Sequence, residues 1–463
     1  MYPRTGDRSG PRRSALRSGV FATAIFCAGL GACATYQPAP LEKSPPIAHS
    51  LSALRNDADG KKIDVARPLT VGAVALLALQ NNLDLQAQRA AHDVSEAQLI
   101  EAGLLPNPSL SGNYGFLLGG PDSFDAWSVG LTQDLKAIVT IWAKREGARY
   151  AVRQVDAELV WREWELVSKV ALLVVDIVEG DRRAKLLDEA LSILQQLNTR
   201  AQAAFQRGNL DISAVAPVSA ALSGVEKDSA DLARLQQSRR NDLNALLSLA
   251  PGVALPLDPA IDVRPLSAGA VEKLLPDLAN RRPDLVALRL GYHSQEAKVR
   301  AAILGQFPAL VFGGNYSVDT AHVRTAGPSI SLDLPIFDHN QGAIALEQAT
   351  RQKLHDEFTS RLAAATTEIE ASVAEDNLIE RQLHALEAEL PAATKIEQEA
   401  APAYRAGNID ERSYVDLVTT RISKEEDINT LQQLLIESRI RIASLLGTGI
   451  PSVTFPAYQE PKR

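Results

Sequence analysis

The sequence has very few cysteines: among its 463 residues there are two, Cys27 and Cys33. Two cysteines so close in sequence cannot supply the disulfide framework that stabilises many small secreted folds. Aromatic residues make up 5% of the chain, and the formal net charge is −8. A chain with this acidic balance is poorly suited to nucleic acid as its main partner, so the composition argues against nucleic-acid-binding classes.

Signatures of catalysis are missing as well. The chain contains no H-E-x-x-H pair, no G-x-S-x-G elbow and no phosphate-binding loop. Its seven histidines are scattered, and most lie on expected helices, where a histidine is more often a surface residue than a ligand. The sequence therefore predicts that the protein is not an enzyme and has no catalytic residues, no cofactor and no resident metal.

The N-terminus carries the pattern of an export signal. Basic residues precede an apolar run from Gly19 to Leu30, which is too short to cross a bilayer. The run ends in Leu30-Gly-Ala-Cys33, which resembles a bacterial lipobox. We therefore expect residues 1–32 to be a lipoprotein signal peptide and Cys33 to become the acylated mature N-terminus. The alternative is a plain signal peptide followed by a coincidental cysteine.

The rest of the chain is built from two similar halves. The segment Phe205-Gln-Arg-Gly-Asn-Leu-Asp211 matches Tyr404-Arg-Ala-Gly-Asn-Ile-Asp410, a shift of 199 positions (404 minus 205), and flanking apolar residues stay in register. Such self-similarity indicates a repeated structural unit. We expect a first repeat at residues 68–250 and a second at 267–448, joined by a linker at 251–266. Residues 33–67 are expected to be an extended mature N-terminus, and residues 449–463 a disordered tail.

Each repeat is expected to contain a very long helix. Residues 137–207 contain no proline, and apolar residues recur there at helical spacing, which predicts a helix of roughly 100 Å. Residues 340–405 predict a second long helix, in which Pro391 and Pro402 should cause a kink or a break. Further helices are expected at about 70–105, 213–249, 267–280, 283–306 and 411–447.

Between these helices the apolar period changes from 3.6 to 2, which predicts β-hairpins at residues 107–135 and 307–337. Their strands, of about ten residues, place apolar side chains on one face and small polar ones on the other, as in a membrane β-barrel. Four strands cannot close a barrel, and open edges do not survive in lipid. We therefore expect a mainly α protein with a membrane β-barrel portion, assembled as a homotrimer whose three sets of four strands make 12.

Several short motifs follow one another on this duplicated scaffold. They are Arg282-Pro-Asp-Leu285 at a helix start, Phe307-Pro308 before a strand, Leu334-Pro-Ile-Phe-Asp338 after one, and the paired Gly-Asn turns. Over residues 68–448 this order resembles the TolC family of outer-membrane channels from tripartite efflux and secretion systems. The resemblance implies a trimeric 12-stranded β-barrel joined to a periplasmic α-barrel of long-helix hairpins. It also implies passive export across the outer membrane of a Gram-negative bacterium, with a periplasmic adaptor and an inner-membrane pump as partners.

Two other segments indicate which branch of this family the sequence resembles. Leu104-Leu-Pro-Asn-Pro108 and Asp338-His-Asn-Gln-Gly342 are similar to stretches of the cobalt–zinc–cadmium branch, although that branch usually has arginine where His339 stands. The branch works with heavy-metal pumps of the resistance–nodulation–division (RND) type, which implies divalent heavy-metal cations as substrate. Two alternatives stay open: a channel for drugs, other organic solutes or type I secretion, and a structural coiled-coil protein of the envelope.

The Gly-Asn turns are the candidate functional residues, because they join each long helix to its returning helix at the end far from the barrel. The glycines suit a left-handed turn, the aspartates suit a helix N-cap, and the apolar residues between them are expected to be exposed. The resemblance implies that the adaptor docks at this periplasmic tip. The expected docking residues are Gly208, Asn209, Leu210, Asp211, Gly407, Asn408, Ile409 and Asp410. Rings of Asp211 or Asp410 are also expected to narrow the pore entrance.

Overall fold

The computed structural model describes residues 35–58, 61–120, 124–261 and 268–448. The expected signal peptide at 1–32, the lipidation site at Cys33, the tail at 449–463 and positions 262–266 of the linker lie outside the described residues. The chain divides into two compact units, residues 1–46 and 47–463. In the described part of the first unit, residues 35–46 form neither helix nor strand. The described helices and strands all belong to the second unit.

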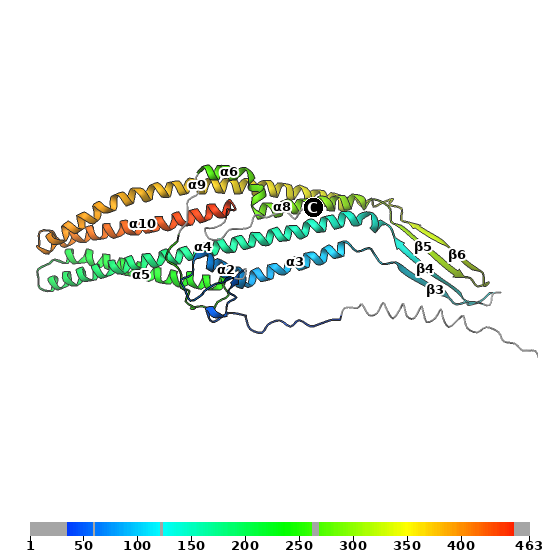
Figure 1. Cartoon of the computed structure of the whole chain (residues 1–463), viewed down its shortest axis with the longest axis horizontal. Helices are drawn as coiled ribbons and strands as arrows, with labels where there is room; N and C mark the ends of the chain where they lie inside the picture. Colours follow the sequence, from blue (N-terminus) through cyan, green and yellow to red (C-terminus); the bar gives the residue numbers. More distant parts are fainter. Residues whose placement is uncertain (1–34, 59–60, 121–123, 262–267, 449–463) are drawn as a thin grey trace, which may run out of the picture. The chain divides into compact units, whose positions relative to one another are not determined.

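The first repeat supplies two short helices, a hairpin and two long helices (Figure 1). A short 3-10 turn, η1 (Leu51–Ala53), and a small ribbon, β1 (Asp57–Ala58) with β2 (Lys61–Lys62), precede it. Its elements are α2 (Val71–Asn81), α3 (Leu83–Ala102), β3 (Ser109–Gly115), β4 (Ala126–Asp134), α4 (Lys136–Gln206) and α5 (Ile212–Leu246). With 71 residues, α4 extends for roughly 100 Å.

The second repeat follows the same plan. Its elements are α6 (Ala268–Leu274), η2 (Leu275–Asp277), α7 (Leu278–Arg281), α8 (Pro283–Leu304), β5 (Leu310–Val318), β6 (Arg324–Leu332), α9 (Gln341–Arg405) and α10 (Glu411–Leu445). The returning helices α5 and α10 each have 35 residues. Across the described residues, no helix combines the length and apolar character needed to cross a membrane.

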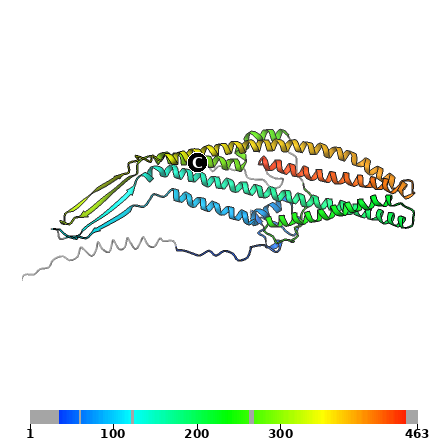
Figure 2. The ribbon, with the colours of Figure 1, turned by 180° about the vertical axis from the view of Figure 1, so that it is seen from behind.

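Five helices, α2, α3, α5, α8 and α10, pack against α4, and α9 packs on α8 and α10 (Figures 1 and 2). Near the sheet, neighbouring helices follow the order α3, α4, α8, α9. Toward the helical turns, the order is α5, α4, α10, α9. Gly180 permits the close approach of α5, because a Cβ at this position would overlap the side chain of Gln236. The outermost helices of the unit are therefore α3 and α9 near the sheet, and α5 and α9 toward the turns.

The four long strands form one antiparallel sheet in the order β3-β4-β5-β6. The two hairpins, far apart in sequence, join through β4 and β5, where Val129 pairs with Tyr316 and Thr132 with Gly313. The sheet leaves β3 and β6 as open edges. The mainly helical fold with a small sheet confirms the fold class expected from the sequence.

One expectation about the helices is wrong, and of the kink or break expected at the prolines of the second long helix the break is excluded. The helix expected at 70–105 is two helices, because the side chain of Asn82 accepts a hydrogen bond from Leu85 N at 2.8 Å and so begins α3 as an N-cap. No break occurs in α9, which runs through both Pro391 and Pro402. Both prolines lie on the exposed side of the helix, where a carbonyl oxygen that loses its partner can be hydrated. The strands, at seven to nine residues, are also slightly shorter than expected.

Candidate functional site

The sheet has two chemically different faces. In the observed register, one face is lined by apolar side chains: Leu110, Tyr114, Trp127, Val129, Leu131, Leu310, Phe312, Tyr316, Val318, Ile330 and Leu332. The opposite face carries small polar residues and glycine: Ser109, Ser111, Asn113, Ser128, Gly130, Thr132, Gly313, Asn315, Ser317, Thr325, Ser329 and Ser331. Among the residues of these four strands, only Asp134 and Arg324 are charged, and both stand at strand ends.

The two helical tips repeat one turn. Gly208 has φ +76° and Gly407 has φ +78°, the left-handed conformation that an L side chain rarely adopts. The next residue closes the turn in both copies: Asn209 N donates to Ala204 O and Asn408 N donates to Ala403 O, each at 2.9 Å. Both asparagines are exposed. The backbone thus presents two nearly identical turns, one per repeat.

The aspartates cap the returning helices. Oδ1 of Asp211 accepts from Ser213 N at 2.8 Å, and Oδ1 of Asp410 accepts from Ser413 N at 2.8 Å. In each case the backbone hydrogen bond from the serine lowers the pKa of the aspartate below its usual value. Both carboxylates are therefore ionised at neutral pH and add negative charge at the tip.

The apolar residues of the turns differ from the expectation. Leu210 and Ile409 are half-buried rather than exposed, and both pack against one apolar cluster that fills the tip. The cluster draws residues from all four helices: Ala190, Leu194, Leu197 and Ala201 of α4, Val215 and Val218 of α5, Ala400 of α9, and Tyr414, Val415, Val418 and Ile422 of α10. Packing of the two hairpins against each other thus accounts for Leu210 and Ile409 without an external partner.

Sequence reasoning missed a polar contact at the second tip. Tyr404 Oη donates to Oε2 of Glu411 at 2.6 Å, and the rings of Tyr404 and Tyr414 stack with centroids 4.5 Å apart. Glu411 is buried. Burial, together with the Glu411 carboxylate, raises the pKa of Tyr404 well above its usual value, so the hydroxyl remains a donor.

The first tip lacks this contact. Phe205 stands where the second repeat has Tyr404, and Ile212 stands where it has Glu411. Phe205 is 43% exposed and Ile212 is 59% exposed. The two tips therefore differ in surface chemistry, and comparison of the two copies is the sequence signal that could have revealed the difference.

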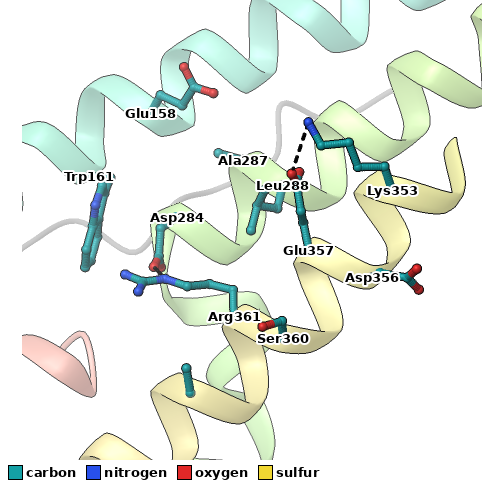
Figure 3. Close-up of a pocket in the computed structure, with 11 residues that line it drawn as sticks. Glu158, Trp161, Asp284, Ala287, Leu288, Lys353, Asp356, Glu357, Ser360 and Arg361 are labelled. Carbon is teal, nitrogen blue, oxygen red and sulfur yellow. Dashed lines mark hydrogen bonds and ion pairs between the residues drawn. The ribbon is translucent and has the colours of Figure 1, made fainter. Parts of the chain in front are cut away.

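A cavity of about 910 Å³ opens between α4, α8 and α9 (Figure 3). Trp161 forms one wall, Asp284 faces Arg361 with Oδ2 2.8 Å from Nε, and Lys353 lies 3.4 Å from Glu357. Burial acts to raise the pKa of Asp284, but Arg282 and Arg361 outweigh it and hold the pKa below its usual value. Because these lining charges already have partners in the chain, the cavity is a poor binding site for a charged ligand.

Several motif residues have structural roles. Arg282 is buried, pairs with Asp284 at 2.8 Å and lies over the Trp161 ring. Asn340 adopts a left-handed conformation and donates through Nδ2 to Ala302 O at 2.7 Å, which ties the start of α9 to the end of α8. These contacts explain the motifs as features of folding rather than of substrate recognition. Within the described ranges, no cluster of three or more His, Cys, Asp or Glu side chains could hold a metal ion.

The chain is similar in sequence to known outer membrane proteins. The profile of the family described as outer membrane efflux protein matches residues 274–448. The cobalt-zinc-cadmium resistance protein CzcC of Cupriavidus metallidurans is 24% identical over 426 residues, which cover 84% of this chain and 90% of the relative. The second repeat of this chain thus matches the outer membrane efflux protein family, and the similarity to CzcC extends over most of the chain. A second relative in this comparison, the pyoverdine export outer membrane protein OpmQ of Pseudomonas aeruginosa, is 26% identical over 91% of this chain and 95% of its own length.

Solved structures of outer membrane efflux channels share the fold. The structure of CusC aligns with a TM-score of 0.70 and 18% identity, covering 90% of this chain and all (100%) of its own. The open-state MtrE outer membrane channel of Neisseria gonorrhoeae aligns with a TM-score of 0.67 and 18% identity, covering 89% of this chain and 98% of its own. The shared fold thus extends over both repeats.

Proposed function

We propose that this outer membrane efflux protein is the exit channel of a tripartite system, through which divalent heavy-metal cations leave passively. A periplasmic adaptor and an inner-membrane RND-type pump would deliver the substrate. The observation that carries the proposal is the two-faced sheet. An apolar face is suited to lipid, and an opposite face of hydroxyls, amides and glycine is suited to a water-filled pore that binds its substrate weakly.

The channel is proposed to be a homotrimer. Open strands at β3 and β6 would be intolerable in lipid, and four strands are too few to enclose a pore. Three copies joined edge to edge would complete a barrel of 12 strands, and the long helices would continue it into the periplasm as an α-barrel. Acylation of Cys33 would anchor the mature N-terminus in the same membrane.

The adaptor is proposed to dock on the paired tips. Asn209 and Asn408 are exposed at matching positions and offer both donors and acceptors. Because Leu210 and Ile409 belong to the core of the tip, their part in docking would be to hold the turn in shape, together with Gly208 and Gly407. Asp211 and Asp410 would form carboxylate rings around the entrance, which would favour cations.

The proposal that the substrate is a metal cation rests on the similarity to CzcC, which is named for cobalt, zinc and cadmium. A second candidate is an organic solute, favoured by the similarity to OpmQ, which is named for pyoverdine export. The polar face of the sheet, whose one charged residue is Asp134 at the end of β4, would suit either class. The tip carboxylates favour cations.

Deletion and complementation would decide between the candidates. A strain lacking this channel should lose resistance to zinc, cobalt or cadmium, and the intact gene should restore it. If the deletion strain were sensitive only to dyes, drugs or siderophores, the result would indicate that the protein exports organic solutes instead. Purified protein in planar bilayers should conduct ions, and an absence of conductance would favour a structural coiled-coil role instead.

A further inference from the structure

The cavity between α4, α8 and α9 has an apolar lining. Its volume of about 910 Å³ lies in the range of about 300–1,000 Å³ that is typical of binding pockets. Trp161 forms one wall, and Ala287 and Leu288 of α8 lie beside it (Figure 3). Ala364 of α9 adds to the lining. The charged side chains Asp284, Arg361, Lys353 and Glu357 are paired within the chain, so the cavity is suited to an apolar or aromatic occupant.

A row of contacts connects the last described residues to this cavity. Gly447 packs against Trp164 so closely that an added Cβ would lie 2.7 Å from Cη2 of the indole. The rings of Trp164 and Trp161 have centroids 6.5 Å apart, and Trp161 lines the cavity. Nη2 of Arg281 donates to Gly447 O at 3.3 Å and holds this end of the chain in place. Thr448, the last described residue, is therefore close to the cavity wall.

The residues that follow Thr448 can reach the cavity. They number fifteen (463 minus 448) and span up to about 50 Å when extended. Two aromatic residues, Phe455 and Tyr458, lie in the second half of this tail. The tail also has three prolines, which restrict its backbone and so lower the conformational entropy lost on docking: Pro451, Pro456 and Pro461.

The charge of the tail complements that of the cavity rim. Glu158 on α4 and Asp356 on α9 are exposed at the rim, and among the described residues neither forms an ion pair with lysine or arginine. The tail carries Lys462 and Arg463 against one acidic residue, Glu460. Exposed pairs of this kind are weak, so they would orient the tail while the aromatic side chains supply most of the binding.

We propose that residues 449–463 fold back and dock in this cavity of the same chain. Phe455 and Tyr458 lie against Trp161, and the basic end of the tail lies at the acidic rim. The docked tail bridges α4, α8 and α9, and it fastens the place where the end of α10 packs against the start of α8. The inference is independent of the channel function, because it concerns contacts within one chain.

A disulfide tests where the tail lies. Ser360 lines the cavity, and Ala457 stands between the two tail aromatics. In the detergent-solubilised full chain, a mild oxidant should join Ser360→Cys to Ala457→Cys at least tenfold faster than it joins the control His384→Cys to Ala457→Cys. His384 is exposed on α9 on the other side of Ile369, which shares an apolar cluster with Leu445 at the end of α10.

The control site is also within reach of the tail. Along α9, His384 lies about 22 Å from Ile369, and position 457 can extend about 30 Å from Thr448. A non-reducing denaturing gel identifies the product: a bond within one chain leaves a monomer, whereas a bond between copies gives a dimer. Ala457→Cys alone controls for a bond to the native Cys33.

Removal of the aromatic side chains should undo the docking. Phe455→Ser with Tyr458→Ser should slow the Ser360→Cys cross-link about tenfold and speed amide exchange in the tail. Ile450→Ser is the matched control, since two residues beyond Thr448 reach only about 7 Å and stop short of the cavity. Equal cross-linking at Ser360→Cys and His384→Cys would show an undocked tail and overturn the inference. A dimer as the main product would also overturn it, because the tail in the cavity would then belong to another copy.

Discussion

Tyr404 and Glu411 face each other across the second tip, with the tyrosine hydroxyl 2.6 Å from the carboxylate of a buried glutamate. Tyr404→Phe should leave that carboxylate without its donor and destabilise the second tip by about 1–3 kcal/mol. Amide hydrogen exchange around the turn measures the change as faster local opening. The matched control is Phe205→Tyr at the first tip, which adds a hydroxyl at an exposed position and should be nearly neutral. Equal effects at both tips would contradict the assigned role of the hydrogen bond.

The left-handed glycines make a second prediction. Gly208→Ala and Gly407→Ala should each cost about 1–2 kcal/mol in tip stability, because φ near +76° and +78° is unfavourable for an L residue. The asparagine variants at the same positions should be milder, since asparagine tolerates this conformation better. Gly342→Ala in α9, where an added Cβ meets nothing within 4 Å, serves as control and should not destabilise. Hydrogen exchange at both turns would measure the series.

His92 links α3 to α4 in a pH-dependent way. Its Nδ1 lies 2.6 Å from Oδ1 of Asp156, and this hydrogen bond, opposed by partial burial, raises the pKa of His92 above its ordinary value. The raised pKa means that the stabilisation is complete below about pH 6.5 and is lost as the pH rises through the folded-state pKa. Exchange in α3, corrected for intrinsic rates, should therefore be slower at pH 6 than at pH 8.5. His92→Gln should remove this difference, whereas His384→Gln, at an exposed site, should keep it.

Glu437, near the contact between the two repeats, also makes the folded protein less stable as the pH rises, but here because the ionised form is unfavourable. Burial raises the pKa of Glu437, and the nearby Asp176 carboxylate adds to the rise, while Gln433 and Arg239 oppose it. A raised carboxyl pKa means that stability is lost as the pH rises through it, so the ionised form is a burden at neutral pH. Glu437→Gln should raise the melting temperature at pH 7.5, and the gain should vanish below about pH 4. A lower melting temperature at pH 7.5 would show that Arg239 dominates.

Acylation at Cys33 is tested by metabolic labelling. Palmitate label should appear in the wild-type protein and be absent from Cys33→Ser. The unlipidated variant should still insert in the outer membrane, because acyl anchoring and insertion of the apolar sheet face are separate contributions. A wild-type protein without label would indicate a plain signal peptide instead.

Much of the architecture could be inferred from the sequence because its signals are periodic and repeated. The absence of proline from 137–207, the change of period at the hairpins and the shift of 199 positions are properties of long stretches, which single residues rarely override. The turn chemistry was also predictable, since Gly208 and Asp211 act locally. These features are set by near neighbours in the chain.

What could not be inferred depends on packing between distant segments. Leu210 and Ile409 lie in turns, where apolar residues suggest exposure, yet the two hairpins pack together and half-bury them. Asn82 interrupts a helical pattern because its side chain makes two hydrogen bonds. It accepts one from Leu85 N and donates one, at 3.0 Å, to Leu246 O at the end of α5. Leu246 is far from Asn82 in the sequence, and the apolar period carries no information about such a distant partner.

The uninterrupted run of α4 also limits how the length of this protein can vary. Each residue added to a helix advances it by 1.5 Å and turns everything beyond by about 100°. One inserted residue would rotate the tip cluster away from α10. Seven residues make almost two whole turns, so a matched change of seven in α4, α5, α9 and α10 would preserve every seam and alter the reach by about 10 Å. The distance from the sheet to the helical turns can therefore change without loss of packing only by matched insertions close to whole numbers of turns, such as about seven or eleven residues.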